Sequence, residues 1–291
     1  MGKWEIPPKG GHMDLADGIY FQNMTTKEVE ERLKKCDLII LPIGSTENHG
    51  PHACYGEDTF LVTRIAETVA KKTGCTVSQP LWYGSHPFHH LGMPGTIPID
   101  ENIFTAYISQ IIAGFWNAGF RKQIILNGHG QEYVLPTAIH RFAKKYQVPG
   151  IFINLNWYYA IPQFMKDKVH GGPFETPFIH ADEAETSYSL ALFPEMIHME
   201  DAVDGEPRGF ISPEHIDKAG NIYQKPIAWY GHAGCGAAEI IATPQGVVGK
   251  ATLANGEKAR AGLEAFFDYM ESLILDIMDR FPPGKLPPAE L

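Results

Sequence analysis

Apolar residues along this chain occur in short runs that alternate with helical patterns. Continuous apolar runs predict three buried strands, at Leu38 to Ile43, Gln123 to Leu126 and Ile151 to Leu155. Helices are predicted around Leu61 to Val69, with Gly74 as the stop, and over Ile103 to Phe115, Val134 to Phe142, Asp182 to Leu192 and Gly256 to Arg280. This alternation is typical of βα units around a mostly parallel sheet.

The pattern runs through most of the chain without an internal repeat. We therefore expect a single α/β domain over residues 1–291, with short N- and C-terminal extensions. The segment from Phe193 to Pro244 is irregular and rich in Gly, Pro and His, as functional or interfacial loops often are. The Pro-rich segment from Phe281 to Leu291 is expected to be a tail.

Composition and net charge limit the classes of molecule that this protein is expected to bind. A net charge of −10 argues against nucleic acid and against an anionic membrane surface. The four cysteines form no C-x-x-C pair, which suits free thiols in a reducing compartment. The first residues lack an apolar core of signal-peptide type, and no apolar run approaches membrane-spanning length. We expect a cytoplasmic protein.

The first polar cluster follows the predicted strand that ends at Ile43. It comprises Gly44 to His52, followed by Glu57 and Asp58. Glu47 and His49 are two residues apart, so in extended chain their side chains point the same way. A carboxylate and an imidazole together suit Zn, Mn or Fe. Alternatively, Glu47 and His49 are a solvated loop pair and Asp58 is only a helix N-cap.

The second polar cluster follows the next predicted strand. His129 stands between Gly128 and Gly130, which allow a close backbone approach to a ligand or metal. The alternative is a histidine in an ordinary tight turn. Because ligands of open α/β sheets bind at the carboxyl ends of the strands, both clusters are expected at one edge of the sheet.

The third cluster stands at the start of the helix predicted from Asp182. His180 precedes that helix and Glu185 lies one turn into it. A histidine near a carboxylate can move protons near neutral pH. A charged helix start would explain Asp182 and Glu183 well, but it explains His180 poorly.

Four ordered motifs resemble the creatininase family of metal-dependent amidohydrolases. They are Gly44 to His52 with Asp58, Asn127 to His129, His180 with Glu185 to Ser187, and His90 to Thr96. With Gly246 to Lys258, the resemblance spans roughly residues 35 to 265. It implies a three-layer α/β/α sandwich around a mostly parallel sheet, and an assembly of several copies, such as a hexamer.

The resemblance also implies roles for individual residues. Glu47, Asp58 and His129 would hold one divalent metal, and His49 would share Asp58 with a second. His180 would be the general acid and base, with Glu185 as a further catalytic residue. In creatininase itself a glutamate stands two residues after the histidine of the second motif and binds the second metal. Gln131 occupies that position here, so one or two ions of Zn, Mn or Fe are expected.

Because Gln131 replaces the metal-binding glutamate of creatininase, we expect a substrate other than creatinine. Another branch of the family opens cyclic diketones such as 3-dehydro-scyllo-inosose in inositol breakdown, by attack of metal-activated hydroxide on a ring carbonyl. We expect a small polar cyclic substrate of this kind, contacted by His90, Gln131 and Trp157. The alternatives are hydrolysis of creatinine or another cyclic amide, and a non-catalytic protein that binds a metabolite through a metal.

Overall fold

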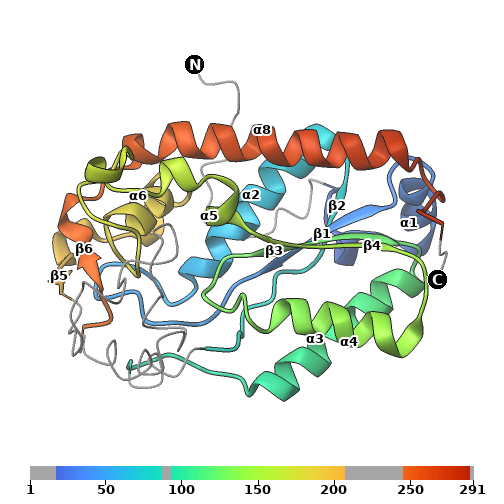
Figure 1. Cartoon of the computed structure of the whole chain (residues 1–291), viewed down its shortest axis with the longest axis horizontal. Helices are drawn as coiled ribbons and strands as arrows, with labels where there is room; N and C mark the ends of the chain where they lie inside the picture. Colours follow the sequence, from blue (N-terminus) through green and yellow to red (C-terminus); the bar gives the residue numbers. More distant parts are fainter. Residues whose placement is uncertain (1–17, 87–92, 207–244, 289–291) are drawn as a thin grey trace.

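The computed structural model describes residues 18–86, 93–206 and 245–288. Within these residues the central sheet contains β1 (Leu38–Ile43), β2 (Thr76–Val77), β3 (Lys122–Asn127) and β4 (Ile151–Asn156). The strands lie in the order β2-β1-β3-β4, and each neighbouring pair is parallel (Figure 1). A small antiparallel pair, β5 (Asp204–Gly205) with β6 (Gly249–Lys250), lies apart from this sheet.

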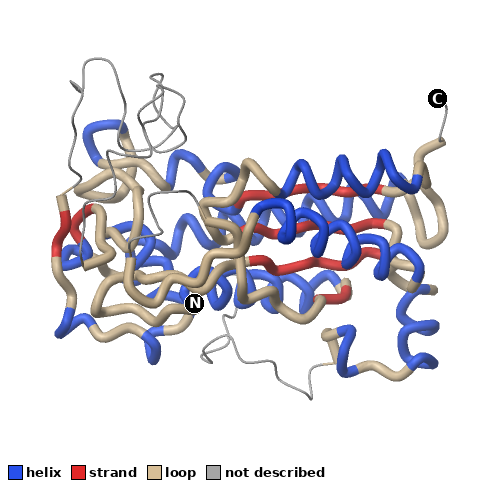
Figure 2. The backbone as a smooth tube through the Cα atoms, turned by 90° about the horizontal axis from the view of Figure 1, so that it is seen from below, coloured by secondary structure: helices blue, strands red, loops and turns tan. Residues whose placement is uncertain are grey.

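Helices cover both faces of the sheet; Figure 1 shows the resulting layers, and Figure 2 shows the strands side by side. One layer contains α2 (Glu57–Thr73), α5 (Trp157–Ala160), α6 (Glu183–Leu192) and the long α8 (Gly256–Arg280), and the opposite layer contains α3 (Glu101–Asn117) and α4 (Leu135–Tyr146). Helix α1 spans Thr26–Leu33. Short 3₁₀ turns occupy Phe21–Asn23, Pro162–Phe164, Lys168–His170, Pro194–Met196, Met199–Asp201 and Ala251–Leu253.

The apolar strands are continuous because both of their faces are buried. In β1, Leu38 and Ile40 belong to the core beneath α2 and α8, whereas Ile39 and Leu41 belong to the core beneath α3 and α4. Side chains along a strand alternate between the faces, so a strand covered on both sides must be apolar at every position. The expected three-layer α/β/α sandwich is therefore confirmed.

Helix α3 forms where the sequence predicts it but turns a different face inward than the spacing used to find it. Ile103 and Tyr107 are 64% and 53% exposed. The buried face carries Phe104, Ile108 and Ile112 instead. The helix contains two apolar stripes, and packing against the sheet selects only one of them.

The start of the predicted C-terminal tail is docked on the fold. Lys122, at the start of β3, is fully buried and forms an ion pair with Asp37. The other carboxylate oxygen of Asp37 accepts a hydrogen bond from the backbone of Gly284, at 3.0 Å. Residues 281–284 are thus held against the sheet. The predicted irregular segment is described only from Phe193 to residue 206, and residues 207–244 lie outside the described part.

The sheet delivers three chain segments to one edge. The segment after β1 begins at Gly44, and the segment after β3 begins at Gly128. After β2 the chain continues beside β1, where Leu81 bridges Ile43, and it reaches the same edge at residues 84–86. A Cβ on Gly44 would come within 2.3 Å of Thr59, and one on Gly128 within 2.4 Å of the carbonyl oxygen of Asp58. The first turn of α2 therefore packs directly against both strand ends. Within the described ranges, no helix has the length and apolarity needed to cross a membrane.

Candidate metal centre

Glu47, Asp58 and His129 meet at the edge of the sheet. Nδ1 of His129 lies 2.9 Å from Oε2 of Glu47 and 3.1 Å from Oδ2 of Asp58. All three side chains are buried. Sequence analysis placed these residues on one ion, and the structure brings them together.

A second group adjoins the first through Asp58. Its other oxygen, Oδ1, lies 3.6 Å from Nε2 of His49. The same nitrogen of His49 lies 3.6 Å from Oε2 of Glu57 and 3.8 Å from Oε2 of Glu185. One aspartate thus faces one imidazole with each of its oxygens.

Asp58 does not cap its helix, contrary to the alternative interpretation. It is the second residue of α2, and Gly56 occupies the N-cap position without a side-chain bond. The hydroxyl of Ser45 donates to Oδ2 of Asp58 at 2.6 Å and holds the carboxylate toward the strand ends. Asp58 and Glu57 stand in the first turn of the helix, where its dipole favours negative charge.

The carboxylates and imidazoles of this cluster shift one another's pKa values. Burial opposes a charged imidazole, yet the carboxylates of Glu47 and Asp58 outweigh it and raise the pKa of His129 to about 10. Burial raises the pKa of Glu57 to about 7, against the opposing pull of His49. Burial, with Glu57 beside it, also raises the pKa of Glu185 well above its usual value.

These residues fit divalent cations. Nε2 of His49 and Oε2 of Glu57 are buried and have no hydrogen-bond partner among the described residues, although buried polar atoms normally have one. The potential ligand atoms of His49, Glu57, Asp58 and Glu185 all lie within 4.8 Å of one another. Mixed imidazole and carboxylate donors suit Zn, Mn or Fe. Glu57, Asp58, His49 and Glu185 would hold one ion, and Glu47 with His129 would hold another beside it.

His180 lies beside both groups, within 4 Å of Glu47 and of Glu185. Its Nε2 is 2.7 Å from the carbonyl oxygen of Asn48, and that oxygen can only accept, so Nε2 carries the proton. Nδ1 is then the basic nitrogen, 3.9 Å from Oε2 of Glu185. The ring centroid is 4.7 Å from that of His49. Thus Asn48 fixes the tautomer of the predicted acid and base.

The loop that carries Asn48 is held by the fourth motif. The amide of Asn48 donates to the carbonyl of Pro94 at 2.8 Å, and its backbone N–H donates to Oγ1 of Thr96 at 3.1 Å. The backbone N–H of Ile97 donates to the carbonyl of Thr46 at 3.0 Å. This accounts for the Met-Pro-Gly-Thr sequence as a support for Glu47 and His49.

The residues around Glu185 show the helix-start chemistry that the sequence also allowed. Asp182 caps α6, because its Oδ1 accepts the backbone N–H groups of Ala184 and Glu185 at 2.7 and 3.0 Å. Ala181 has a positive φ of 48° and donates its N–H to Glu185 at 2.5 Å. The turn between His180 and the helix therefore also fixes the direction of Glu185.

Gln131 is bound into the scaffold rather than aimed at the metal groups. Its amide nitrogen donates to the carbonyl of Gly44 at 3.2 Å and to Oδ1 of Asn127 at 3.0 Å. Its amide oxygen accepts the backbone N–H of Ser85 at 3.1 Å. The side chain ties the three segments at the sheet edge together. Its predicted contact with substrate stays a prediction.

Of the other two predicted substrate contacts, only Trp157 belongs to the described residues. Trp157 begins α5 with 1% of its surface exposed, and its ring packs against Tyr188 at 4.7 Å in the core. The predicted contact of Trp157 with substrate stays a prediction. His90 falls outside the described residues.

Two buried residues of the cluster were given no role by sequence reasoning. Glu57 stands beside Asp58 in the first motif, and its signal was the pair of adjacent carboxylates at a helix start. His86 groups with Glu47 and His129, and its ring centroid lies 4.4 Å from that of His129. Its signal in the sequence was weak: Gly84 and Ser85 precede it, and the same pair, Gly44 and Ser45, opens the segment that carries Glu47.

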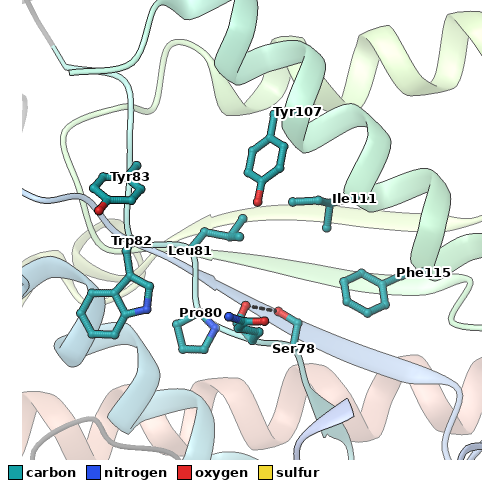
Figure 3. A pocket seen from close by; sticks show the side chains of 9 residues that line it. Ser78, Pro80, Leu81, Trp82, Tyr83, Tyr107, Ile111 and Phe115 are labelled. Atoms are coloured by element: carbon teal, nitrogen blue, oxygen red, sulfur yellow. Dashed lines mark hydrogen bonds between the residues drawn. The ribbon is translucent and has the colours of Figure 1, made fainter. Parts of the chain in front are cut away.

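A separate cavity of about 350 Å³ lies on the α3 side of the segment that leads to His86. Figure 3 shows Leu81 of that segment facing Tyr107 and Ile111 of α3. None of the residues that line this cavity belongs to the metal-binding groups, so the cavity is separate from the candidate metal centre.

Comparison with known proteins gives a consistent picture. The family profile "Creatininase: Creatinine amidohydrolase" matches residues 22–274. A 3-dehydro-scyllo-inosose hydrolase from Thermotoga maritima is 66% identical over 279 residues, covering 96% of this chain and 90% of that protein. A creatinine amidohydrolase from Pseudomonas putida is 26% identical over 67% of this chain and 80% of its own length. Among solved structures, a creatininase with a Glu-to-Gln substitution, complexed with creatine, superposes with a TM-score of 0.71 at 25% identity, covering 91% of this chain and 99% of its own.

Proposed function

Because the chain belongs to the creatininase family of hydrolases, we propose that it opens the ring of a cyclic polyhydroxylated diketone, 3-dehydro-scyllo-inosose, with the help of divalent metal. The observation that carries this proposal is 66% identity, over 96% of the chain, with a hydrolase of that substrate. The buried carboxylates and imidazoles at the sheet edge support the metal requirement.

The proposed ligands are those that the sequence analysis named, with Glu57 and Glu185 added. Glu47, Asp58 and His129 would hold one ion, and His49, Glu57, Asp58 and Glu185 the other. A divalent ion at such a position polarises a carbonyl and lowers the pKa of bound water from about 15.7 to about 7. The identity of the metal is left to Zn, Mn or Fe by these donors.

His180 would move the protons of the reaction. Its Nδ1 is the basic nitrogen, since Nε2 donates to the carbonyl of Asn48. Water adds to one ring carbonyl and gives up a proton to this nitrogen. Glu185, 3.9 Å away, stabilises the imidazolium that results. General acid and base help of this kind contributes about 10²- to 10⁴-fold.

Ring opening follows from the second ketone of the substrate. In a ring whose two ketones flank one carbon, the bond between the hydrated carbonyl carbon and that middle carbon can break. Its electron pair becomes an enolate of the second ketone, and His180 returns a proton to the middle carbon. The products of water addition and bond cleavage are a carboxylate and a ketone in one open chain, so atoms and electrons balance.

The test is a substrate panel on protein of known metal content. Metal-replete enzyme is expected to release one carboxylate for each molecule of the cyclic diketone and to act far more slowly on creatinine. Fast turnover of creatinine without turnover of the diketone would instead establish the cyclic amide alternative. Saturable binding of the diketone without turnover would establish a metal-dependent binding protein.

Two variants separate metal binding from proton transfer. His129→Ala is expected to lose metal and activity together, because a ligand is removed. His180→Ala is expected to retain its metal and to lose turnover by about 10²- to 10⁴-fold. Full metal content in His129→Ala would overturn the ligand assignment. Light scattering on the same preparations tests the expected homo-oligomer.

A further inference from the structure

His86 lies inside the metal centre although no family motif brought it there. Its side chain is 4% exposed. One potential ligand atom of each of Glu47, His86 and His129 lies within 4.8 Å of the other two. The three residues come from the segments that follow β1, β2 and β3, so the sheet itself assembles the group.

The spacing of these atoms suits a single ion. Bonds from Zn to histidine nitrogen and to carboxylate oxygen are about 2.0–2.2 Å, so the ligand atoms of a tetrahedral site lie about 3.3–3.6 Å apart. The atoms of this group all lie within 4.8 Å of one another, so they need to close by at most about 1.5 Å to reach that spacing. The rings of His86 and His129 are inclined by 56°, so they are not stacked face to face.

We propose that His86 is a protein ligand of the ion held by Glu47 and His129, and that the centre therefore has a nitrogen-rich and an oxygen-rich position. This inference rests on the proposed metal dependence. The first position offers two imidazoles, from His86 and His129, with the carboxylate of Glu47. Oδ2 of Asp58, 3.1 Å from His129, completes it.

The second position has the opposite balance. It offers one imidazole, from His49, and carboxylates from Glu57, Asp58 and Glu185. Imidazole-rich sites suit Zn, whereas carboxylate-rich sites suit Mn and Mg, which prefer oxygen. The two positions thus differ in the ion that each prefers, and His86 supplies the nitrogen that makes the difference.

The substitution at position 131 is consistent with this division. The side chain of Gln131 forms hydrogen bonds with Gly44, Asn127 and Ser85. Ser85 is the residue directly before His86 in the sequence. Gln131, at the position where a glutamate could have bound metal, therefore holds the segment that carries His86. Glu57 and Glu185 supply the carboxylates on the other side.

The experiment measures ion binding rather than turnover. Apo-protein is titrated with Zn²⁺ and with Mn²⁺, and Co²⁺-substituted protein is examined by absorption spectroscopy. The full-length wild type is expected to take up one Zn²⁺ tightly and one Mn²⁺ at a distinct position. His86→Ala is expected to weaken the tight Zn²⁺ site by at least the roughly 10- to 100-fold that loss of an outer-shell partner produces, and to change the Co²⁺ spectrum. Its Mn²⁺ affinity should be unchanged.

Two further variants keep the test decisive. His86→Asp supplies a carboxylate ligand and should restore part of the affinity. His52→Gln is the matched control, because His52 is also buried but lies outside the metal-binding groups, and it should leave both ions bound. Circular dichroism establishes that each variant is folded, and if His86→Ala is not, His86→Asp decides. Unchanged Zn²⁺ affinity and an unchanged Co²⁺ spectrum in the His86 variants would overturn the proposal. Wild type that binds both ions but fails to open the diketone would overturn the proposed function and leave His86 a ligand.

Discussion

Replacement of Gln131 by glutamate changes little more than one nitrogen for one oxygen, yet the structure predicts a large loss of stability. The amide nitrogen of Gln131 donates to Gly44 and to Asn127, and a carboxylate can donate to neither. Asn127 cannot simply rotate its amide to compensate. Its own nitrogen already donates to the carbonyl of His129 at 2.6 Å and to Asn156 at 3.0 Å.

The expected magnitude follows from these contacts. Two hydrogen bonds are lost, at about 1 kcal/mol each, and the carbonyl of Gly44 loses its donor at a cost of roughly 1–3 kcal/mol. Oδ1 of Asn127 keeps the backbone N–H of His129 as a donor, at 3.3 Å. Gln131→Glu should therefore destabilise the ion-free protein by about 4 kcal/mol when the introduced carboxyl group is ionised. A protonated carboxyl retains one donor, so the folded state favours protonation and raises the pKa of this group.

The sign of the pH dependence distinguishes this effect from simple loss of packing. Because the folded pKa is raised above the unfolded value of about 4.3, the variant loses stability relative to wild type as the pH rises through this interval. Urea unfolding of ion-free protein at pH 5 and pH 8 measures the difference. The control Gln131→Met lacks all three hydrogen bonds, and its destabilisation should not depend on pH.

A Gln131→Glu protein with wild-type stability at pH 8 would refute this reasoning. So would a gain of a third bound ion, because the new carboxylate would then have left the scaffold for the metal centre.

Three other predictions follow from the described contacts. Asp37→Ala should lower the free energy of unfolding by about 3–5 kcal/mol in urea titrations, since it leaves Lys122 buried without its partner; an effect below about 1 kcal/mol would show that water reaches Lys122. Burial lowers the pKa of His52 to about 4, so the unfolded chain binds a proton first and the folded state loses up to about 3 kcal/mol as the pH falls from 6.5 to 4. His52→Gln should flatten that part of the stability profile, and an identical profile would contradict the assignment. Gly128→Ala should lower stability by about 1–3 kcal/mol and weaken metal binding, because its Cβ would meet the carbonyl of Asp58; Gly114→Ala, at an open position of α3, is the matched control and should be neutral or stabilising.

The three long strands and most helices could be predicted because their apolar spacing is local. Leu38–Ile43 and Gly256–Arg280 each form an element with the predicted bounds. The inward face of α3 could not be predicted, because Ile103 and Phe104 begin two stripes of equal periodicity and only the packing decides between them. The same limit applies to the tail, since the contact of Gly284 with Asp37 joins distant parts of the chain.

The candidate site was predictable where a motif concentrates its residues. Glu47, His49 and Asp58 share one loop and helix start, and His129 follows a strand. His86 was missed because β2 is only two residues long and gives no strand signal of its own. The role of Gln131 was out of reach as well, because its partners belong to three separate segments.

The donors that converge on Asp58 come from parts of the chain that meet only after folding. Glu47, His129 and Glu185 are far apart in sequence, and the unfolded chain offers little more than the adjacent Glu57 and Asp58. Any ion that binds the assembled group therefore binds the folded state in preference to the unfolded chain, and so stabilises the fold. At a free concentration one hundred times its dissociation constant, each ion would add about 2.7 kcal/mol. The temperature at which this enzyme unfolds would then depend on the free concentration of metal. A chelator would lower that temperature by removing the ions.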